Sequence, residues 1–246
     1  MEYGIQMYSV RDITEKNMDG ALKALAEMGY KFVEFAGFFG IPADEIKAML
    51  DKYGLKVSGT HTGWQEIAEH YEETLAYHKA IGNTRIIVPG ADLTTKAKLD
   101  AFIDMMNEFQ PKLAAEGITL GYHNHDIEFM RMEDGSLILE LLYDNAPALQ
   151  GEIDTFWVQA GGQNPADWVR KLSGRMPLLH LKDYGIHERQ RAMFPIGSGN
   201  LDWKSIIAEG EAAGVEYFIV EQDVCLKDPF DSLADSLHYL VENFVK

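Results

Sequence analysis

The chain has few of the features that mark secreted, membrane or nucleic-acid-binding proteins. Cys225 is its one cysteine, so no disulfide can form within the chain, and no apolar run approaches the ~20 residues of a membrane-spanning helix. Basic residues are scarce: 22 Lys and Arg against 39 Asp and Glu give a formal net charge of −17, which repels phosphate backbones. No signal-type start follows Met1. We therefore expect a cytoplasmic protein without nucleic-acid or membrane partners.

Short apolar runs recur along the 246 residues at the spacing of a repeated strand and helix unit. Eight runs occur, at 4–8, 32–35, 55–59, 84–88, 119–123, 149–153, 178–182 and 217–221. Each interval can hold one helical crossover between parallel strands. The count predicts a closed (β/α)8 TIM barrel, in the α/β class, and the absence of a linker predicts one domain over 1–246. An open doubly wound sheet is the alternative, but no GxGxxG follows the first run.

The segments between the runs have helical periodicity, as in Ala21, Leu22, Leu25 and Met28. Several of them end on a glycine that can adopt a left-handed C-cap before the next strand, in EMGYKFVEF, KYGLKVSG, AEGITLGY and AAGVEYFIV.

Polar residues at the strand ends are rich in metal-ligand types, and a barrel gathers these ends at its mouth. They are Glu34, His61, His123, Asn124, His125, Asp154, His180, Lys182, Asp183, Glu221, Gln222 and Asp223. His123, Asp154, His180 and Glu221 come from four consecutive strands and offer two imidazoles and two carboxylates. This set suits Mn²⁺, Zn²⁺ or Fe²⁺, whereas Ca²⁺ would require more oxygen ligands. A hydrogen bond to a backbone carbonyl explains any single histidine equally well, but four such residues together favour a metal.

Five segments, GITLGYHNH, EIDTFW, LLHLKDY, PIGSGNLDW and YFIVEQD, resemble the xylose isomerase-like TIM barrel family of sugar-phosphate isomerases and epimerases. That family includes ketose 3-epimerases and inosose dehydratase, and the resemblance covers the full length. It implies a divalent ion, commonly Mn²⁺, held by Glu, Asp, His and Glu at the ends of strands five to eight, with Zn²⁺, Co²⁺, Fe²⁺ or Mg²⁺ as alternatives. Asp154, His180 and Glu221 match the last three positions. The resemblance also implies a homodimer or homotetramer.

Two positions depart from the pattern that the family implies. His123 stands in place of the first glutamate, so Glu221 is the one remaining acid/base carboxylate, and His125, Glu128 or Lys182 becomes the second group. Trp157 replaces a substrate-binding histidine and can stack on a sugar ring, as can Trp64. Core packing is an equally good explanation of Trp157. The expected substrate contacts are Glu34, His61, Trp64, Glu128, Trp157 and Lys182, with Glu221, His125 and Lys182 as the catalytic groups.

The stretch after the seventh run contains Gly197, Ser198 and Gly199, whose backbone N–H groups could bind a phosphate. His187, Arg189 and Arg191 could add positive charge there, although a plain turn and an exposed basic loop explain the same residues. His70, His78 and His238 lie in helix-period segments, so we expect them on the outer ring, far from the mouth and without a role.

The leading hypothesis is a metal-dependent sugar or sugar-phosphate isomerase or epimerase that works through an enediolate. A lyase or hydratase (dehydratase) acting on a keto-sugar or keto-glycoside shares the first step and is the close alternative. A catalytically silent sugar-binding barrel is an alternative of another class. An apurinic endonuclease is disfavoured, because the resemblance would then require a trinuclear zinc site with an additional histidine where Trp157 stands, and because the net charge opposes DNA.

Overall fold

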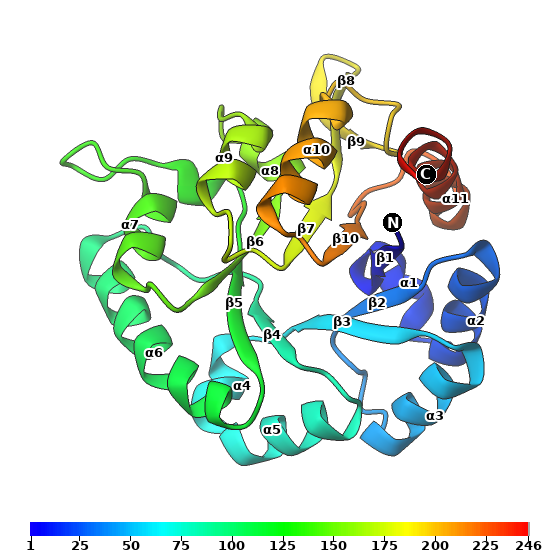
Figure 1. Cartoon of the computed structure of the whole chain (residues 1–246), viewed down its shortest axis with the longest axis horizontal. Helices are drawn as coiled ribbons and strands as arrows, with labels where there is room; N and C mark the ends of the chain where they lie inside the picture. The colour runs from blue at the N-terminus through cyan, green and yellow to red at the C-terminus, as the bar shows by residue number, and fades with distance from the viewer. Residues whose placement is uncertain (246) are drawn as a thin grey trace.

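The computed structural model describes residues 1–245 and has a closed barrel of eight parallel strands at its centre (Figure 1). The predicted TIM barrel is confirmed. The predicted domain over 1–246 includes residue 246, which lies outside the described residues. The barrel strands are β1 (Tyr3–Gln6), β2 (Phe32–Ala36), β3 (Lys56–His61), β4 (Arg85–Val88), β5 (Thr119–His123), β6 (Gln150–Asp154), β7 (Leu178–Leu181) and β10 (Tyr217–Val220). Every strand lies within two residues of its predicted bounds.

The barrel closes because its first strand, β1, pairs with its last strand, β10. β1 pairs in parallel with β2 on one side, where Ile5 faces Val33, and with β10 on the other, where Ile5 faces Val220. All eight pairs are parallel, so every strand delivers its C-terminal end to the same mouth.

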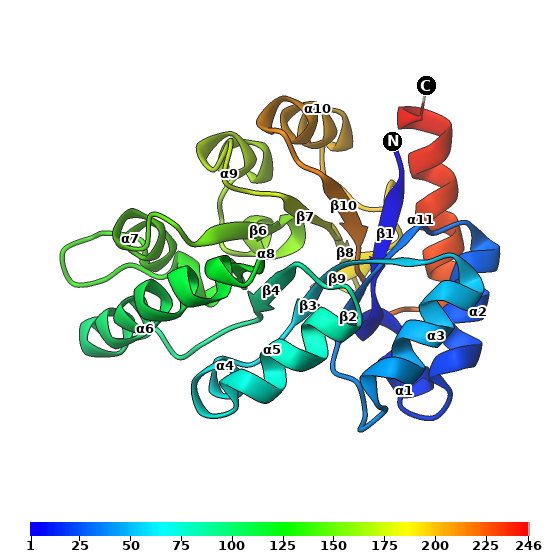
Figure 2. The same ribbon diagram turned by 60° about the horizontal axis from the view of Figure 1, so that its bottom comes forward.

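Helices form a ring around the strands (Figures 1 and 2). The ring consists of α2 (Met18–Met28), α3 (Ala43–Tyr53), α4 (Trp64–Glu69), α5 (Tyr71–Ala80), α6 (Lys96–Ala115), α7 (Ile138–Asn145), α9 (Pro165–Lys171), α10 (Trp203–Ala213) and α11 (Pro229–Phe244). Short helices stand close to the strand ends: η1 (Met7–Val10), α1 (Arg11–Thr14), η2 (Ile127–Phe129) and α8 (Thr155–Ala160). No helix among residues 1–245 combines the length and the hydrophobicity that a bilayer crossing requires.

The helix boundaries follow the predicted signals. In α2 three residues of the predicted face, Ala21, Leu22 and Leu25, are buried in the core, and the fourth, Met28, is half-buried against it. Side-chain oxygens satisfy free N–H groups at the helix starts, as where Thr95 accepts from the Lys98 N–H and Asp202 from the Ser205 N–H. The four glycines predicted as C-caps, Gly29, Gly54, Gly117 and Gly214, all have positive φ.

The barrel interior is layered. Its deepest part is apolar and is filled by Ile87, Leu178 and Ile219. Gly121 lets a neighbouring strand approach, because a Cβ there would lie 2.6 Å from the Ile87 Cδ1. Two residues further along the strands, inward positions become polar, since Leu178 is followed by His180 and Ile219 by Glu221. The layer of ionisable groups therefore rests on an apolar floor.

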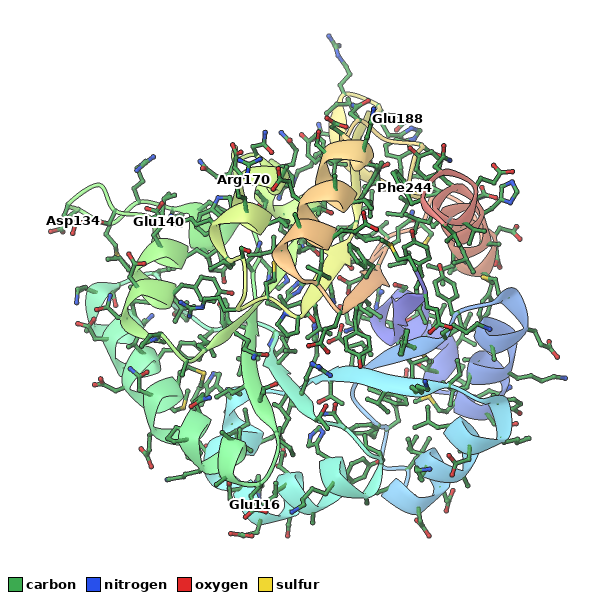
Figure 3. All side chains as sticks on the ribbon, in the orientation of Figure 1. Glu116, Asp134, Glu140, Arg170, Glu188 and Phe244 are labelled. Carbon is green, nitrogen blue, oxygen red and sulfur yellow. The ribbon has the colours of Figure 1, made fainter. Side chains whose placement is uncertain are left out.

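The stretch after β7 is a hairpin, where the sequence interpretation expected a long loop. β8 (Asp183–His187) pairs antiparallel with β9 (Gln190–Phe194), and Glu188 and Arg189 form the turn with φ values of 48° and 66°. Glu188 marks the tip, which projects from the rim of the molecule (Figure 3). His187 and Arg189 are exposed there, whereas Arg191 forms an ion pair with Asp126 at 2.6 Å.

Candidate functional site

The four residues expected to hold a metal come together at the mouth. Suitable ligand atoms of His123, Asp154, His180 and Glu221 all lie within 4.8 Å of one another, and all four side chains are buried. The strand register explains this, because Asp154 pairs with His180 across β6 and β7 while Glu221 directly follows β10. The Asn124 side chain accepts from the Asp154 N–H at 3.1 Å and so fixes the end of β6.

Each imidazole of this cluster has one nitrogen facing the mouth and one facing deeper carboxylates. His180 Nδ1 lies 3.0 Å from Glu221 Oε2, and its Nε2 lies 2.6 Å from Glu34 Oε2. His123 Nε2 lies 3.9 Å from Asp154 Oδ2, and its Nδ1 lies 3.2 Å from Glu152 Oε2. Glu34 can thus accept the Nε2–H of His180 and leave its Nδ1 free to bind a cation, whereas the His123 Nδ1 approaches Glu152 without a hydrogen bond.

Glu152 is the residue that the sequence interpretation missed. It is fully buried, and its Oε2 lies 2.7 Å from His61 Nε2 and 3.3 Å from His180 Nε2. With His61, His123 and His180 it forms a second group of potential ligands. Alternate residues of a strand point to the same face, so Glu152, two residues before Asp154, could have been predicted to face the barrel interior as Asp154 does.

The ionisable groups beneath the mouth, Glu34, Glu152 and His180, shift one another's pKa values. Burial raises the pKa of Glu34 to about 7, and the Glu152 carboxylate adds to this shift. Burial alone would also raise the pKa of Glu152, but His180 and His61 outweigh it and hold this pKa well below its ordinary value. Burial would lower the pKa of His180, yet the Glu152 and Glu34 carboxylates raise it well above its ordinary value. Glu152 is therefore the anion that balances the histidines.

Lys182 lies among three carboxylates. Its Nζ is 2.7 Å from Glu221 Oε2, 2.9 Å from Asp154 Oδ2 and 3.1 Å from Asp223 Oδ1. Burial would lower the pKa of Lys182, but Asp154 and Glu221 outweigh burial and raise it. Burial would raise the pKa of Glu221, but Lys182 and His180 keep it well below its ordinary value. At neutral pH Glu221 is therefore an ionised carboxylate next to an ammonium.

A cavity of about 600 Å³ opens above this cluster, a size typical of small-ligand sites. We call it the mouth cavity. Of the predicted site residues, it is lined by His61, His123, His125, Trp157, Lys182 and Glu221; Tyr8, Arg11 and Asp223 are further lining residues. Glu34, Asp154 and His180 lie buried beside or beneath it. Most of the predicted catalytic and binding residues therefore share one chamber.

Trp157 and His125 form one wall of the mouth cavity. Their ring centroids lie 5.2 Å apart, and the Lys182 Nζ and the Arg191 guanidinium lie 5.4 Å and 5.7 Å from the Trp157 ring centroid. Burial lowers the pKa of His125 to about 4, with a further contribution from Lys182. His125 is therefore a neutral imidazole at physiological pH and can accept a proton.

Besides Glu34, two more of the predicted substrate contacts lie outside the residues that line the mouth cavity. Glu128 is buried, accepts from the Tyr122 hydroxyl at 2.6 Å and from the His125 N–H at 2.8 Å, and so holds the backbone that carries His125. Trp64 packs against the hydrophobic core at the start of α4.

The predicted phosphate cradle is already occupied by a side chain. The Asp183 carboxylate accepts from the N–H groups of Gly197 at 2.8 Å, Gly199 at 3.0 Å and Leu201 at 3.3 Å, and from the Trp203 indole at 2.8 Å. These donors are therefore not turned toward a ligand, and the phosphate interpretation of this loop was wrong.

Two further residues differ from the sequence interpretation. Asp223 was noted at a strand end but given no role, yet it lines the mouth cavity, and burial together with Glu221 raises its pKa to about 7. His78 lies in the outer helix α5, as expected, but it is not far from the mouth. Its ring is buried against Thr60 and Thr62 at the end of β3.

The mouth-facing donors fit a divalent cation. Two imidazole nitrogens and two carboxylates are a common set for Mn²⁺, Zn²⁺ or Fe²⁺. Asp154 Oδ2 is buried without a hydrogen bond, although the Lys182 ammonium lies nearby. A buried carboxylate oxygen that accepts no hydrogen bond is unfavourable unless a cation interacts with it.

The chain belongs to the xylose isomerase-like TIM barrel family, whose model matches residues 22–242. A Parabacteroides distasonis protein described as a sugar phosphate isomerase/epimerase is 26% identical, with a TM-score of 0.87 over 100% of this chain and 99% of that one. The probable 3-DHS dehydratase from Bacillus anthracis is 14% identical, with a TM-score of 0.76 over 99% of this chain and 100% of that one. An L-ribulose 3-epimerase is also 14% identical, with a TM-score of 0.75 over 98% and 93%. The last two likenesses show the fold alone. A search of curated proteins finds no match.

Proposed function

We propose that the protein is a metal-dependent sugar isomerase or epimerase that removes a proton from a carbon next to a carbonyl group. The observation that carries this proposal is the convergence of His123, Asp154, His180 and Glu221 within 4.8 Å beneath the mouth cavity. A bound divalent ion, with Mn²⁺ as our expectation, would stabilise the charge that develops on the sugar oxygens when the proton leaves.

Glu221 is the proposed base. Its carboxylate lines the mouth cavity, and the neighbouring Lys182 keeps it ionised. Lys182 is also placed to interact with sugar oxygens, and Trp157 offers an aromatic face to the C–H side of a ring. His125, neutral and on another wall of the cavity, is the proposed partner that returns or relays the proton. The reaction that these side chains support is proton transfer at carbon.

Elimination is the second candidate, and one observation favours it. β5 ends in His123, so the mouth has no second carboxylate in the place opposite Glu221 that two-base epimerisation would use. After Glu221 removes the proton, an oxygen substituent can leave from the adjacent carbon. This elimination is the reaction of a lyase or dehydratase. The leaving oxygen would need a proton, which the Lys182 ammonium can donate directly or through the neutral His125 imidazole.

Proton exchange in D₂O tests both candidates. The protein is incubated with Mn²⁺ and a panel of keto-sugars, keto-glycosides and sugar phosphates, and the C–H signals are followed by NMR. Because Glu221 is also an expected metal ligand, Glu221→Gln should abolish deuterium entry even at Mn²⁺ concentrations that saturate the variant. His123→Ala should weaken Mn²⁺ binding measured by calorimetry. Glu211→Gln, a surface change on α10, is the matched control.

The products separate the candidates. Reprotonated isomers indicate isomerisation or epimerisation, and loss of the substituent indicates elimination. Sugar binding without any exchange across the panel would overturn both and leave a silent binding barrel.

A further inference from the structure

A second cavity of about 390 Å³ adjoins the mouth cavity at the ends of β2 and β3. We call it the side pocket. His61 lines both cavities, and Ala36 of the mouth cavity is followed in the chain by Gly37 of the side pocket. The two cavities are therefore neighbours that meet at one imidazole. A ligand that occupies both cavities would have to pass the His61 side chain, which is 9% exposed.

The walls of the side pocket suit an uncharged sugar ring. Phe38 and Tyr77 supply aromatic surface, with ring centroids 4.3 Å apart, and the Tyr77 hydroxyl donates to the Ile41 carbonyl at 2.7 Å, which fixes that ring. Glu66 and Glu73 place exposed carboxylates at the rim. Aromatic faces pack on the C–H side of a sugar, and carboxylates accept from its hydroxyls.

The charges in both cavities disfavour a phosphate. No lysine or arginine is among the residues that line the side pocket, whereas Glu66 and Glu73 would repel an anion. In the mouth cavity, Lys182 already faces three carboxylates, and the Arg11 guanidinium, which also lines this cavity, donates to the backbone carbonyls of Tyr8 and Asp223. The Asp183 carboxylate occupies the backbone N–H groups of the loop after β9. These groups leave little positive potential for a phosphate dianion.

The loop that carries Phe38 is held in a strained shape. Phe39 has a φ of 53° and is 45% exposed, between glycines with φ values of 91° at Gly37 and 73° at Gly40. A left-handed conformation is unfavourable for a side chain with a Cβ, and such strain is concentrated at ligand-binding sites. This strain points to a binding role for the wall that Phe38 provides.

We propose that the side pocket is a second sugar subsite, which binds an uncharged ring joined to the ring in the mouth cavity. The preferred ligand is then a neutral glycoside of two units and not a sugar phosphate. The assignment of the reacting ring to the mouth cavity rests on the proposed function, but the two-unit preference is a statement about binding that holds without turnover.

The test measures binding of neutral disaccharides with β-1,4, α-1,4, β-1,6 and α,α-1,1 linkages, compared with glucose and glucose 6-phosphate. Calorimetry gives the affinities, and saturation-transfer NMR shows which rings contact the protein. The test variant is Glu66→Ala with Glu73→Ala. The control is Glu69→Ala with Glu72→Ala, which makes the same change of charge on exposed positions of the same two helices but outside the side pocket.

At least one disaccharide should bind about tenfold more tightly than glucose or glucose 6-phosphate, with saturation reaching both rings. The test variant should weaken that binding at least fivefold and leave glucose binding unchanged, while the control variant leaves both unchanged. The proposal is overturned if no disaccharide exceeds glucose, if glucose 6-phosphate binds best, or if the two double variants behave alike. Disaccharide-selective binding without proton exchange would refute the proposed function alone, and exchange on monosaccharides without this selectivity would refute the subsite alone.

Discussion

Replacing Asp183 with alanine tests whether this buried carboxylate holds the loop after β9 in place. Five donors point at it: the Tyr184 N–H at 2.9 Å, the N–H groups of Gly197, Gly199 and Leu201, and the Trp203 indole. Leaving one buried N–H donor without an acceptor costs ~1–3 kcal/mol, so removing the shared acceptor of several buried donors should cost ~3–5 kcal/mol. For a chain of this length each kcal/mol lowers Tm by ~2–4 °C. We therefore expect a fall of roughly 6–20 °C, measured by thermal unfolding.

The same variant should acquire affinity for small anions. Without the carboxylate, the N–H groups converge on an anion-sized gap, so sulfate or phosphate should restore part of the lost stability. At ten times its Kd an anion adds about 1.4 kcal/mol, which is ~3–6 °C in Tm.

Asp202→Ala is the control, since Asp202 belongs to the same stretch but caps α10 at the surface. It should cost ~1 kcal/mol and gain nothing from anions. If the Tm of Asp183→Ala lies within 3 °C of the wild-type Tm, the loss of unfolding free energy is about 1 kcal/mol or less. Such a small loss would show that Asp183 does not hold the loop in place.

Three further outcomes are expected. Burial lowers the pKa of His78 from 6.5 to about 4. The contribution of neutral His78 to the free energy of unfolding is therefore complete above pH 6.5 and decreases as the pH falls, because His78 takes up a proton in the unfolded chain first. The loss amounts to about 2 kcal/mol at pH 5. Urea unfolding at pH 7.5 and 5 should show a loss about 2 kcal/mol larger in the wild type than in His78→Gln, since His125 contributes to the loss in both proteins; equal losses would contradict it. Glu152→Gln should weaken Mn²⁺ binding ~10–100-fold in calorimetry, because it removes the carboxylate behind two of the histidines, and an unchanged affinity would argue against that role. Lys182→Met should tighten Mn²⁺ binding at least about tenfold, since its ammonium lies against the same oxygens of Asp154 and Glu221; weaker binding would show that Lys182 assists the metal.

The barrel could be predicted because each strand is a short apolar run and each interval holds a helix. β5 was predicted to the residue, at Thr119–His123. The hairpin after β7 was missed because its turn is Glu188–Arg189, which lacks the Asn-Gly or Asp-Gly signal of a two-residue turn. Apolar and polar residues also alternate only weakly along β8 and β9, because Ile186 is exposed and the charged Arg191 interrupts the alternation.

The convergence of the four expected metal ligands was predictable because these residues close four consecutive strands. Glu152 was overlooked because it lies inside an apolar run, where the sequence alone does not show that its carboxylate faces three histidines. Four of the five partners of Asp183 lie 14 to 20 residues further along the chain and meet it only through the fold of the connecting segment. Contacts of this kind have no local sequence signature.

The pairing of β1 with β10 also has a consequence for protein synthesis. The barrel cannot close until the residues of β10, Tyr217–Val220, have left the ribosome, because β1 needs them as its second neighbour. Until then the sheet stays open between β1 and β7, and Glu221, which contributes to the raised pKa of His180, is not yet in place. The charge network of the interior is therefore completed only when the last strand is added.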